Sequence, residues 1–153
     1  MESSAGDPLA LALRALAHKE RSVAELVEWL RERGVAGEDA ESVLNYLVEI
    51  GVLDDERFAA RFAEDKREIA GWGSERIRDA LLKRGISSDD AETALAAEGD
   101  ELERALAVLA ERAPDLGDEA GRGKAFGFLV RRGFGPDLAY EAIRRAGDRP
   151  DLA

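Results

Sequence analysis

One short pattern occurs three times in this chain of 153 residues, and it constrains the fold more than any other feature. The three segments align without gaps, and their glycines are 51 and 48 residues apart. They read LRERGVAGEDAESVL (30–44), LLKRGISSDDAETAL (81–95) and LVRRGFGPDLAYEAI (129–143). Repetition with a period of about 50 residues predicts a fold built from repeated supersecondary units, each packed against its neighbours.

The glycine of each segment predicts a sharp helix end. Gly34, Gly85 and Gly133 each follow an arginine and precede an apolar residue. Helices often end at a glycine in the left-handed conformation. The residue after the glycine then contacts the residue four positions before the glycine. The predicted contact pairs are Leu30–Val35, Leu81–Ile86 and Leu129–Phe134, and the arginines of the last turn, where the helix dipole favours a cation, are Arg33, Arg84 and Arg132.

Helix start signals agree with this pattern. Ser22 and Glu25 predict a capping box, Ser87 is placed to cap the helix that follows it, and Pro136 suits the first position of a helix capped near Gly135. No segment alternates in the manner of a strand. One more amphipathic stretch precedes each pair of helices, at roughly 8–19, 55–70 and 100–112.

The predicted fold class is therefore all-α, with nine helices in three tandem three-helix repeats that form an elongated, curved array. The repeats are predicted at 1–51, 52–98 and 99–146, and a flexible tail at 147–153. A unit of about 50 residues buries little apolar surface by itself, so neighbouring repeats are expected to pack together. We expect the chain to be a monomer.

Four aromatic side chains are predicted to lie in the core, because they occur at helical spacing from other apolar residues. The residues concerned are Trp29, Tyr46, Phe58 and Phe62. Phe126 and Phe128 are two positions apart on one helix, where side chains diverge by about 200°, so only one of them is expected to face inward.

The acidic triplet in GVLDDERFAARF (51–62) could be a catalytic or metal site, but a structural role explains it. With Asp54 as the N-cap, Leu53 and Phe58 occupy the two positions of a hydrophobic staple. Asp55 and Glu56 then lie in the first turn, beside the positive end of the helix dipole. We therefore interpret the triplet as a helix start.

Other chemistry is poorly represented, and we expect neither enzymatic activity, a cofactor nor a metal. The chain has one histidine, His18, which argues against a histidine-based metal site or catalytic triad. The stretch GWGSERIRD (71–79) resembles a phosphate-binding loop, but a helix precedes it where the motif requires a strand.

Composition bounds the environment of the protein. The net charge of −11 argues against a protein whose main ligand is duplex DNA, because phosphate binding depends on basic side chains. There is no cysteine, which fits a reducing compartment. The N-terminal stretch does not have the pattern of a secretory signal, and no apolar run approaches the roughly 20 residues that span a bilayer. We expect a cytoplasmic protein without membrane contact.

At this level of detail the chain resembles the RecX family of bacterial regulatory proteins. The resemblance lies in four stretches that together cover nearly the whole chain: LAHKERSVAELVEWLRERGV (16–35), VLNYLVEIGVLDDERFAARFAEDK (43–66), GWGSERIRDALLKRGIS (71–87) and KAFGFLVRRGFGPDLAYEAIRR (124–145). RecX proteins are similarly built from three tandem three-helix repeats.

The resemblance implies a protein that binds the RecA recombinase. It implies that the chain lodges in the helical groove of the RecA filament on single-stranded DNA. There it would inhibit the ATPase, strand-exchange and coprotease activities of RecA, and so restrain homologous recombination and the SOS response. An array of repeats suits a polymeric partner, because many modest contacts add up to avidity.

Locally basic clusters are the candidate contact sites for RecA, with weak direct contact to DNA phosphates as an accompanying expectation. They comprise Arg76, Arg78, Lys83, Arg84, Arg122, Lys124, Arg131 and Arg132. The alternative is that these side chains belong to solvated helix faces with acidic partners one turn away. Two other functions stay open: a DNA-binding protein of helix-turn-helix-like repeats, and a helical scaffold for an unrelated protein.

Overall fold

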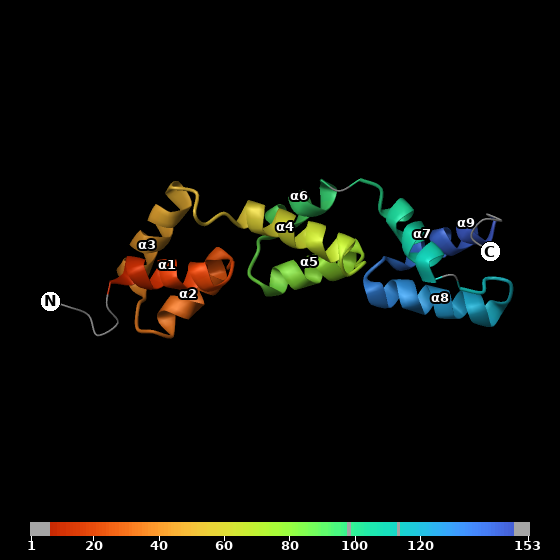
Figure 1. Ribbon diagram of the computed structural model, residues 1–153, viewed down its shortest axis with the longest axis horizontal. Helices are drawn as coiled ribbons and strands as arrows, with labels where there is room; N and C mark the ends of the chain where they lie inside the picture. Colours follow the sequence, from red (N-terminus) through yellow and green to blue (C-terminus); the bar gives the residue numbers. More distant parts are fainter. Residues whose placement is uncertain (1–6, 98, 113, 149–153) are drawn as a thin grey trace. The chain divides into compact units, whose positions relative to one another are not determined.

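The computed structural model describes residues 7–97, 99–112 and 114–148, and these residues form nine α-helices and no strand (Figure 1). The prediction of an all-α chain is confirmed. The predicted tail at 147–153 lies almost entirely outside the described residues, since Gly147 is the last residue of the last helix and only Asp148 follows it there.

The nine helices follow one another in three sets of three. The first set contains α1 (Pro8–His18), α2 (Val23–Arg31) and α3 (Gly37–Glu49). The second set contains α4 (Asp55–Glu68), α5 (Ser74–Lys83) and α6 (Ser88–Ala96). The third set contains α7 (Glu101–Arg112), α8 (Glu119–Arg132) and α9 (Pro136–Gly147).

The predicted glycine-terminated helix end is present in every set, after α2, α5 and α8. Gly34, Gly85 and Gly133 have φ angles of +84°, +82° and +101°. In each case the amide of the following residue donates to the carbonyl five positions earlier, at 2.9 Å, 3.0 Å and 3.0 Å. These are the hydrogen bonds of the Schellman motif, so the prediction is confirmed three times.

An aspartate directly precedes and caps the first helix of each set. Asp7, Asp54 and Asp100 each accept a hydrogen bond through Oδ1 from a backbone amide two or three residues on, at 2.9–3.1 Å. The predicted cap at Asp54 is therefore confirmed, whereas its two counterparts at Asp7 and Asp100 were not predicted. The capping box of Ser22 and Glu25 is also present.

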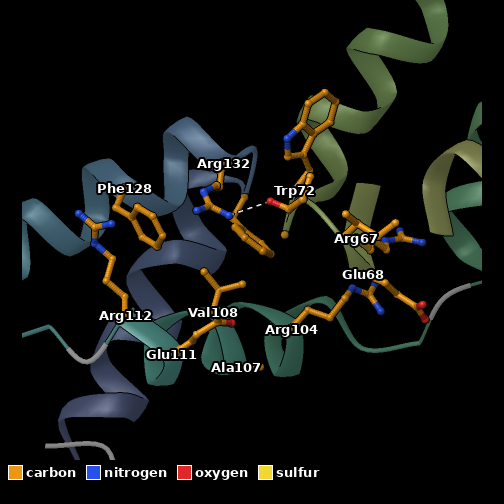
Figure 2. A pocket seen from close by; sticks show the side chains of 14 residues that line it. Arg67, Glu68, Trp72, Arg104, Ala107, Val108, Glu111, Arg112, Phe128 and Arg132 are labelled. Carbon is orange, nitrogen blue, oxygen red and sulfur yellow. Dashed lines mark hydrogen bonds between the residues drawn. The ribbon is translucent and has the colours of Figure 1, made fainter. Parts of the chain in front are cut away.

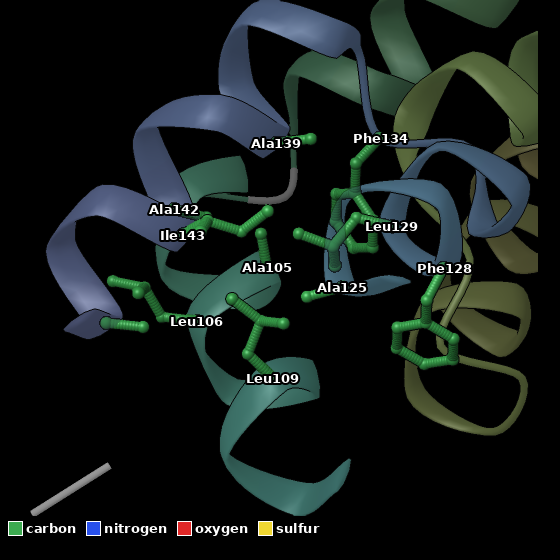
Figure 3. Close-up of a cluster of buried hydrophobic side chains, with 11 residues drawn as sticks. Ala105, Leu106, Leu109, Ala125, Phe128, Leu129, Phe134, Ala139, Ala142 and Ile143 are labelled. Atoms are coloured by element: carbon green, nitrogen blue, oxygen red, sulfur yellow. The ribbon is translucent and has the colours of Figure 1, made fainter. Parts of the chain in front are cut away.

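Each terminal set has its own hydrophobic core. In the first set, leucines and alanines of α1, α2 and α3 bury their side chains together with Val35 and Leu53. In the third set, the core is formed by α7, α8 and α9 (Figure 3). Small residues alternate with large ones there, among them Ala105, Leu129 and Phe134, which are all at most 1% exposed.

The described residues group into two compact units. One comprises the residues up to Arg61 together with Leu81–Thr93, and the other comprises Phe62–Ala80 together with the residues from Ala94 on. Both α4 and α5 contribute to each unit, so the second set is shared between them. The repeat boundaries at 51 and 98 stay predictions from the sequence.

One aromatic prediction is wrong. Tyr46 is 48% exposed, because the buried face of α3 is formed by Leu44 and Leu47 and successive residues turn by about 100°. Trp29 is half-buried against the core of the first set. On α8, Phe128 is buried and Phe126 is half-buried at the edge of the same core. Within the described chain, no helix is both long and apolar enough to cross a membrane.

Candidate interaction site

Neighbouring sets are joined by the same contact in both compact units. In the first unit, the start of α2 packs on the glycine-terminated end of α5. The Ser22 side chain is fully buried, and its Oγ donates to the carbonyl oxygen of Arg84 at 2.6 Å. Glu25, one turn further on, accepts two hydrogen bonds from the guanidinium of Arg84. A side chain at Gly85 would collide with Ala24.

In the second unit, the start of α5 packs on the glycine-terminated end of α8 in the same way. The amide of Gly73 donates to the carbonyl of Arg132 at 2.7 Å, and that of Glu75 donates to the carbonyl of Gly133 at 2.9 Å. A side chain at Gly133 would collide with Arg76. We call the start of the second helix the docking turn, and the glycine with its preceding arginine the receiving face.

An acidic residue completes each contact. Asp55, the first residue of α4, accepts a hydrogen bond from the amide of Val23 at 2.8 Å. Glu101, the first residue of α7, accepts one from the amide of Ser74 at 2.6 Å. Because Val23 and Ser74 are the first residues of α2 and α5, each acid satisfies a helix-start amide of the preceding set. Asp55 of the acidic triplet therefore joins two sets, in addition to the predicted role of the triplet in starting α4.

Two carboxyl groups at the first of these contacts, those of Asp55 and Glu25, have shifted pKa values. Burial raises the pKa of Asp55, and the hydrogen bond from the Val23 amide offsets this only in part. Burial alone would also raise the pKa of Glu25, but the hydrogen bonds from Arg84 and from the Ser22 amide outweigh it, and the pKa of Glu25 is lowered.

The arginine of every receiving face lies over an aromatic ring. The guanidinium carbon is 3.6 Å from the ring centre of Trp29 for Arg33, and 4.8 Å from that of Phe58 for Arg84. The guanidinium carbon of Arg132 lies 4.8 Å from the ring centre of Phe128. Such stacking holds the planar guanidinium in one orientation. The predicted roles of these arginines were the helix dipole for all three and contact with RecA for Arg84 and Arg132; the stacking was not predicted.

A cleft of about 510 Å³ lies in the second unit, between the α4–α5 connection and helices α7 and α8 (Figure 2). Its lining includes four arginines and two glutamates: Arg67, Arg104, Arg112, Arg132, Glu68 and Glu111. Val108 and the ring of Phe128 form an apolar part of its wall. The guanidinium of Arg132 donates to the carbonyl of Ala70 at 2.8 Å, which ties the two sides of the cleft together.

The structure separates the eight predicted contact residues. Lys83 and Arg84 belong to the first unit, and the second unit contains Arg76, Arg78, Arg122, Lys124, Arg131 and Arg132. Two of the eight, the receiving-face arginines, hold the contacts between sets.

The other side chains differ in their surroundings. Arg76 stacks on Trp72 with 4.0 Å from guanidinium to ring centre, and its Nη1 donates to the carbonyl of Arg131 at 3.5 Å. Arg122 bonds the carbonyl of Leu116, and Lys124 is exposed nearby on α8. Arg78 is half-buried.

Sequence reasoning missed the cleft arginines Arg67, Arg104 and Arg112. Arg67 is only 7% exposed and donates to the Ser74 hydroxyl and to the carbonyl of Leu95. The available signal was an arginine on the otherwise apolar stripe that contains Ala63. Within the described ranges, no three side chains of His, Cys, Asp or Glu are grouped so that they could hold a metal ion.

Comparisons with known proteins agree with the repeated architecture. Two family models match the chain: the first three-helix domain of RecX over residues 9–47, and the second three-helix domain of RecX over residues 54–95. A regulatory protein RecX from Chromohalobacter salexigens is 35% identical, over 95% of this chain and 94% of its own. One from Deinococcus radiodurans is 36% identical, over 92% of this chain and 68% of its own.

Two solved structures are also similar. The crystal structure of RecX from Lactobacillus salivarius matches with a TM-score of 0.80 at 22% identity, over 90% of this chain and 93% of that one. A crystal structure of a regulatory protein RecX matches with a TM-score of 0.72 at 25% identity, over 91% of this chain and 72% of that one. The first of these likenesses concerns the fold alone.

Proposed function

Because this chain belongs to the RecX family of regulatory proteins, we propose that it binds the filament that the RecA recombinase forms on single-stranded DNA. On this proposal the chain lodges in the helical groove of the filament. It inhibits the ATPase, strand-exchange and coprotease activities of RecA, and so modulates recombination and the SOS response. The observation that carries the proposal is the alignment with a relative named regulatory protein RecX over 95% of this chain and 94% of the relative.

The placement of the acidic residues supports a regulator that is not an enzyme. Asp54 caps α4, Asp55 bonds the amide of Val23, and Glu25 pairs with Arg84. Each of these carboxylates is thus used to start a helix or to join two sets. The relatives are likewise named as regulatory proteins.

A RecA ATPase assay on single-stranded DNA tests the proposal. The purified chain should inhibit ATP hydrolysis at concentrations below that of RecA, because one molecule spans several subunits of the filament. No inhibition, together with tight and salt-sensitive binding to bare duplex, would favour the DNA-binding alternative. Absence of both effects would leave a scaffold for an unrelated protein.

The exposed basic residues at the start of α8 provide a first test of the contact surface. The variant with Arg122→Glu and Lys124→Glu should require a higher concentration for half-inhibition, because two positive charges toward the filament are reversed. A control with the same change in net charge is Arg144→Glu with Arg145→Glu on α9, whose side chains pair with Glu141. Equal inhibition by both variants would remove this surface from the proposal.

A further inference from the structure

The first set has a receiving face, but among the described residues nothing docks on it. A side chain built at Gly34 would have no neighbour within 4 Å, whereas one at Gly85 or Gly133 would collide with a docking turn. The three glycines have similar backbone conformations: φ is +84° at Gly34, +82° at Gly85 and +101° at Gly133. The difference is therefore in what covers them.

Beside Arg33, the residue that precedes Gly34, lies a hollow of about 420 Å³ with a basic lining. We call it the open face, and it is lined by Leu11, Arg14, Ala15, His18, Arg21, Trp29 and Arg33. Its charged residues are three arginines, and no carboxylate lines it. The guanidinium of Arg33 lies 3.6 Å from the centre of the Trp29 ring, and that of Arg21 lies 5.6 Å from it.

The open face corresponds to one side of the arginine-lined cleft in the third set. Counting from the glycines, Trp29 occupies the position of Phe128, and Arg33 that of Arg132. In the third set, the α4–α5 connection forms the opposite wall, and Arg132 bonds the carbonyl of Ala70 in that wall. The open face has an equivalent stacked arginine, Arg33, but within the described chain no second segment forms an opposite wall.

The chain itself shows what covers a face of this kind. On the receiving face of the second set, Ala24 lies over Gly85, the Ser22 hydroxyl bonds the carbonyl of Arg84, and the Glu25 carboxylate accepts from the guanidinium. In this contact the occupant is the first turn of a helix, with a small residue and a carboxylate one turn in; in the contact with the third set, Arg76 takes the place of Glu25 and stacks on Trp72. We propose that the open face binds the first turn of an acidic helix from a protein partner, with a carboxylate bound by Arg33.

A second copy of this chain does not fit as the occupant. In the third set, the position of Glu25 is taken by Lys124, so the start of α8 offers Arg33 no carboxylate there. The docking position of Ser22 corresponds to Gly121, which the chain's own loop covers, since a side chain there would collide with the carbonyl of Asp115. The helix also begins earlier, at Glu119, with Asp118 as its cap.

Nucleic acid fits less well than a protein. Residues 1–51 contain five basic and ten acidic residues, so a phosphate backbone would approach a set with net negative charge. A helix that presents one or two carboxylates needs only the local arginines. The surrounding acids then disfavour partners with extended negative charge; they include Glu28 on α2 and Glu32, whose carboxylate lies 3.8 Å from the guanidinium of Arg33.

This inference rests on the proposed function and names the surface that meets the filament. The test compares two single variants at the C-terminal end of α2, Arg31→Glu in its last turn and Arg33→Glu just beyond it, in the RecA ATPase assay. Arg31 is exposed and pairs with Glu28, away from the open face, so it provides a control with the same charge change. Arg33→Glu should raise the concentration for half-inhibition by about tenfold, and more with Arg14→Glu added, while Arg31→Glu changes it less than about twofold.

Three readouts separate the outcomes. If the unmodified chain does not inhibit RecA, the proposed function fails and this inference with it. If the unmodified chain inhibits and Arg33→Glu with Arg14→Glu inhibits equally well, only the open face is refuted. If the same variant loses affinity for naked single-stranded DNA by the same factor, the face contacts nucleic acid and the inference is overturned. Arg33→Gln, with thermal unfolding as a check, replaces the reversal if Arg33→Glu does not fold.

Discussion

Asp54 and Asp55 are adjacent in the chain but have different tasks. Asp54 caps its own helix through a local hydrogen bond to the amide of Arg57. Asp55 instead satisfies the first amide of α2, which is 32 residues away in the sequence. Its partial burial and the nearby carboxylates of Asp90 and Asp54 raise its pKa. The oxygen atom of this side chain therefore matters more to the fold than its charge.

Substitutions at Asp55 separate these two properties. Asp55→Asn keeps an oxygen for the Val23 amide and removes a charge that burial disfavours, so the free energy of unfolding at pH 7 should be unchanged or slightly higher. Asp55→Ala leaves the amide without its acceptor and should cost about 1 kcal/mol, as for the loss of a helix cap. Urea unfolding of the two variants measures this. A large loss of stability in the asparagine variant would show that the charge is required.

The pKa of Glu25 is lowered, whereas that of Asp55 is raised, so the stability contributed by Glu25 should depend on pH. Because its folded-state pKa lies below the ordinary value of 4.5, its pair with Arg84 contributes stability that is fully present above pH 4.5. That contribution is lost as pH falls through the folded-state pKa. Glu25→Gln should thus be less stable than the unmodified chain by about 1 kcal/mol at pH 7, and the difference should shrink steadily below pH 4.5. A difference independent of pH would contradict the ion pair.

At the scale of helices, one local motif serves two purposes. The glycine after α2, α5 or α8 ends the helix, and the lack of a side chain then lets the preceding set approach closely at Gly85 and Gly133. Gly34 ends its helix without a neighbouring docking turn among the described residues. Comparing Gly34 with Gly85, which have nearly equal φ angles, therefore separates the role of ending a helix from the role of allowing close approach.

Alanine substitutions make that comparison. Gly34→Ala should cost only the strain of a left-handed alanine, about 1–2 kcal/mol. Gly85→Ala should cost at least about 1 kcal/mol more, because its new methyl group collides with Ala24. Urea unfolding of Gly85→Ala with and without Ala24→Gly isolates the collision as a coupling between the two sites. Equal costs at Gly34 and Gly85 would show that the close approach is not needed.

The sequence predicts those features of the helices that depend on neighbouring residues. The Schellman ends at Gly34, Gly85 and Gly133, the capping box at Ser22 and the cap at Asp54 all follow from local rules. The contacts between sets do not, because the partners of Arg84 and Arg132 are 59 and 62 residues away. For the same reason the arginine-lined cleft was missed, since its walls come from separate helices.

At the scale of the whole molecule, the start of α8 distinguishes the third set from the other two. This helix is 14 residues long, whereas α2 and α5 have 9 and 10 residues, and its added first turn occupies the place of a docking turn. Asp118 caps it, and the amide of Gly121 donates to that carboxylate at 2.7 Å. The third set therefore differs from the other two at the point where a further set would attach.

A monomer is the expected state in solution. Light scattering coupled to size exclusion should give a mass near 16.6 kDa over a wide range of concentrations, because the docking position of α8 is closed and carries Lys124. Lowering the salt concentration should not promote association, since the net charge of −11 makes copies repel one another. Head-to-tail oligomers that Arg33→Glu abolishes would contradict this expectation.

Because α8 starts earlier than α2 and α5, the two ends of the array differ in how readily a further set could be added. A duplicated set placed before Asp7 would meet a bare glycine and a stacked arginine ready to receive it, with Pro8 as the position to change to an acid. A duplicate placed after α9 would meet a helix whose start must first be shortened by a turn. Lengthening the protein by gene duplication or by design should therefore be easier before the first set than after the third.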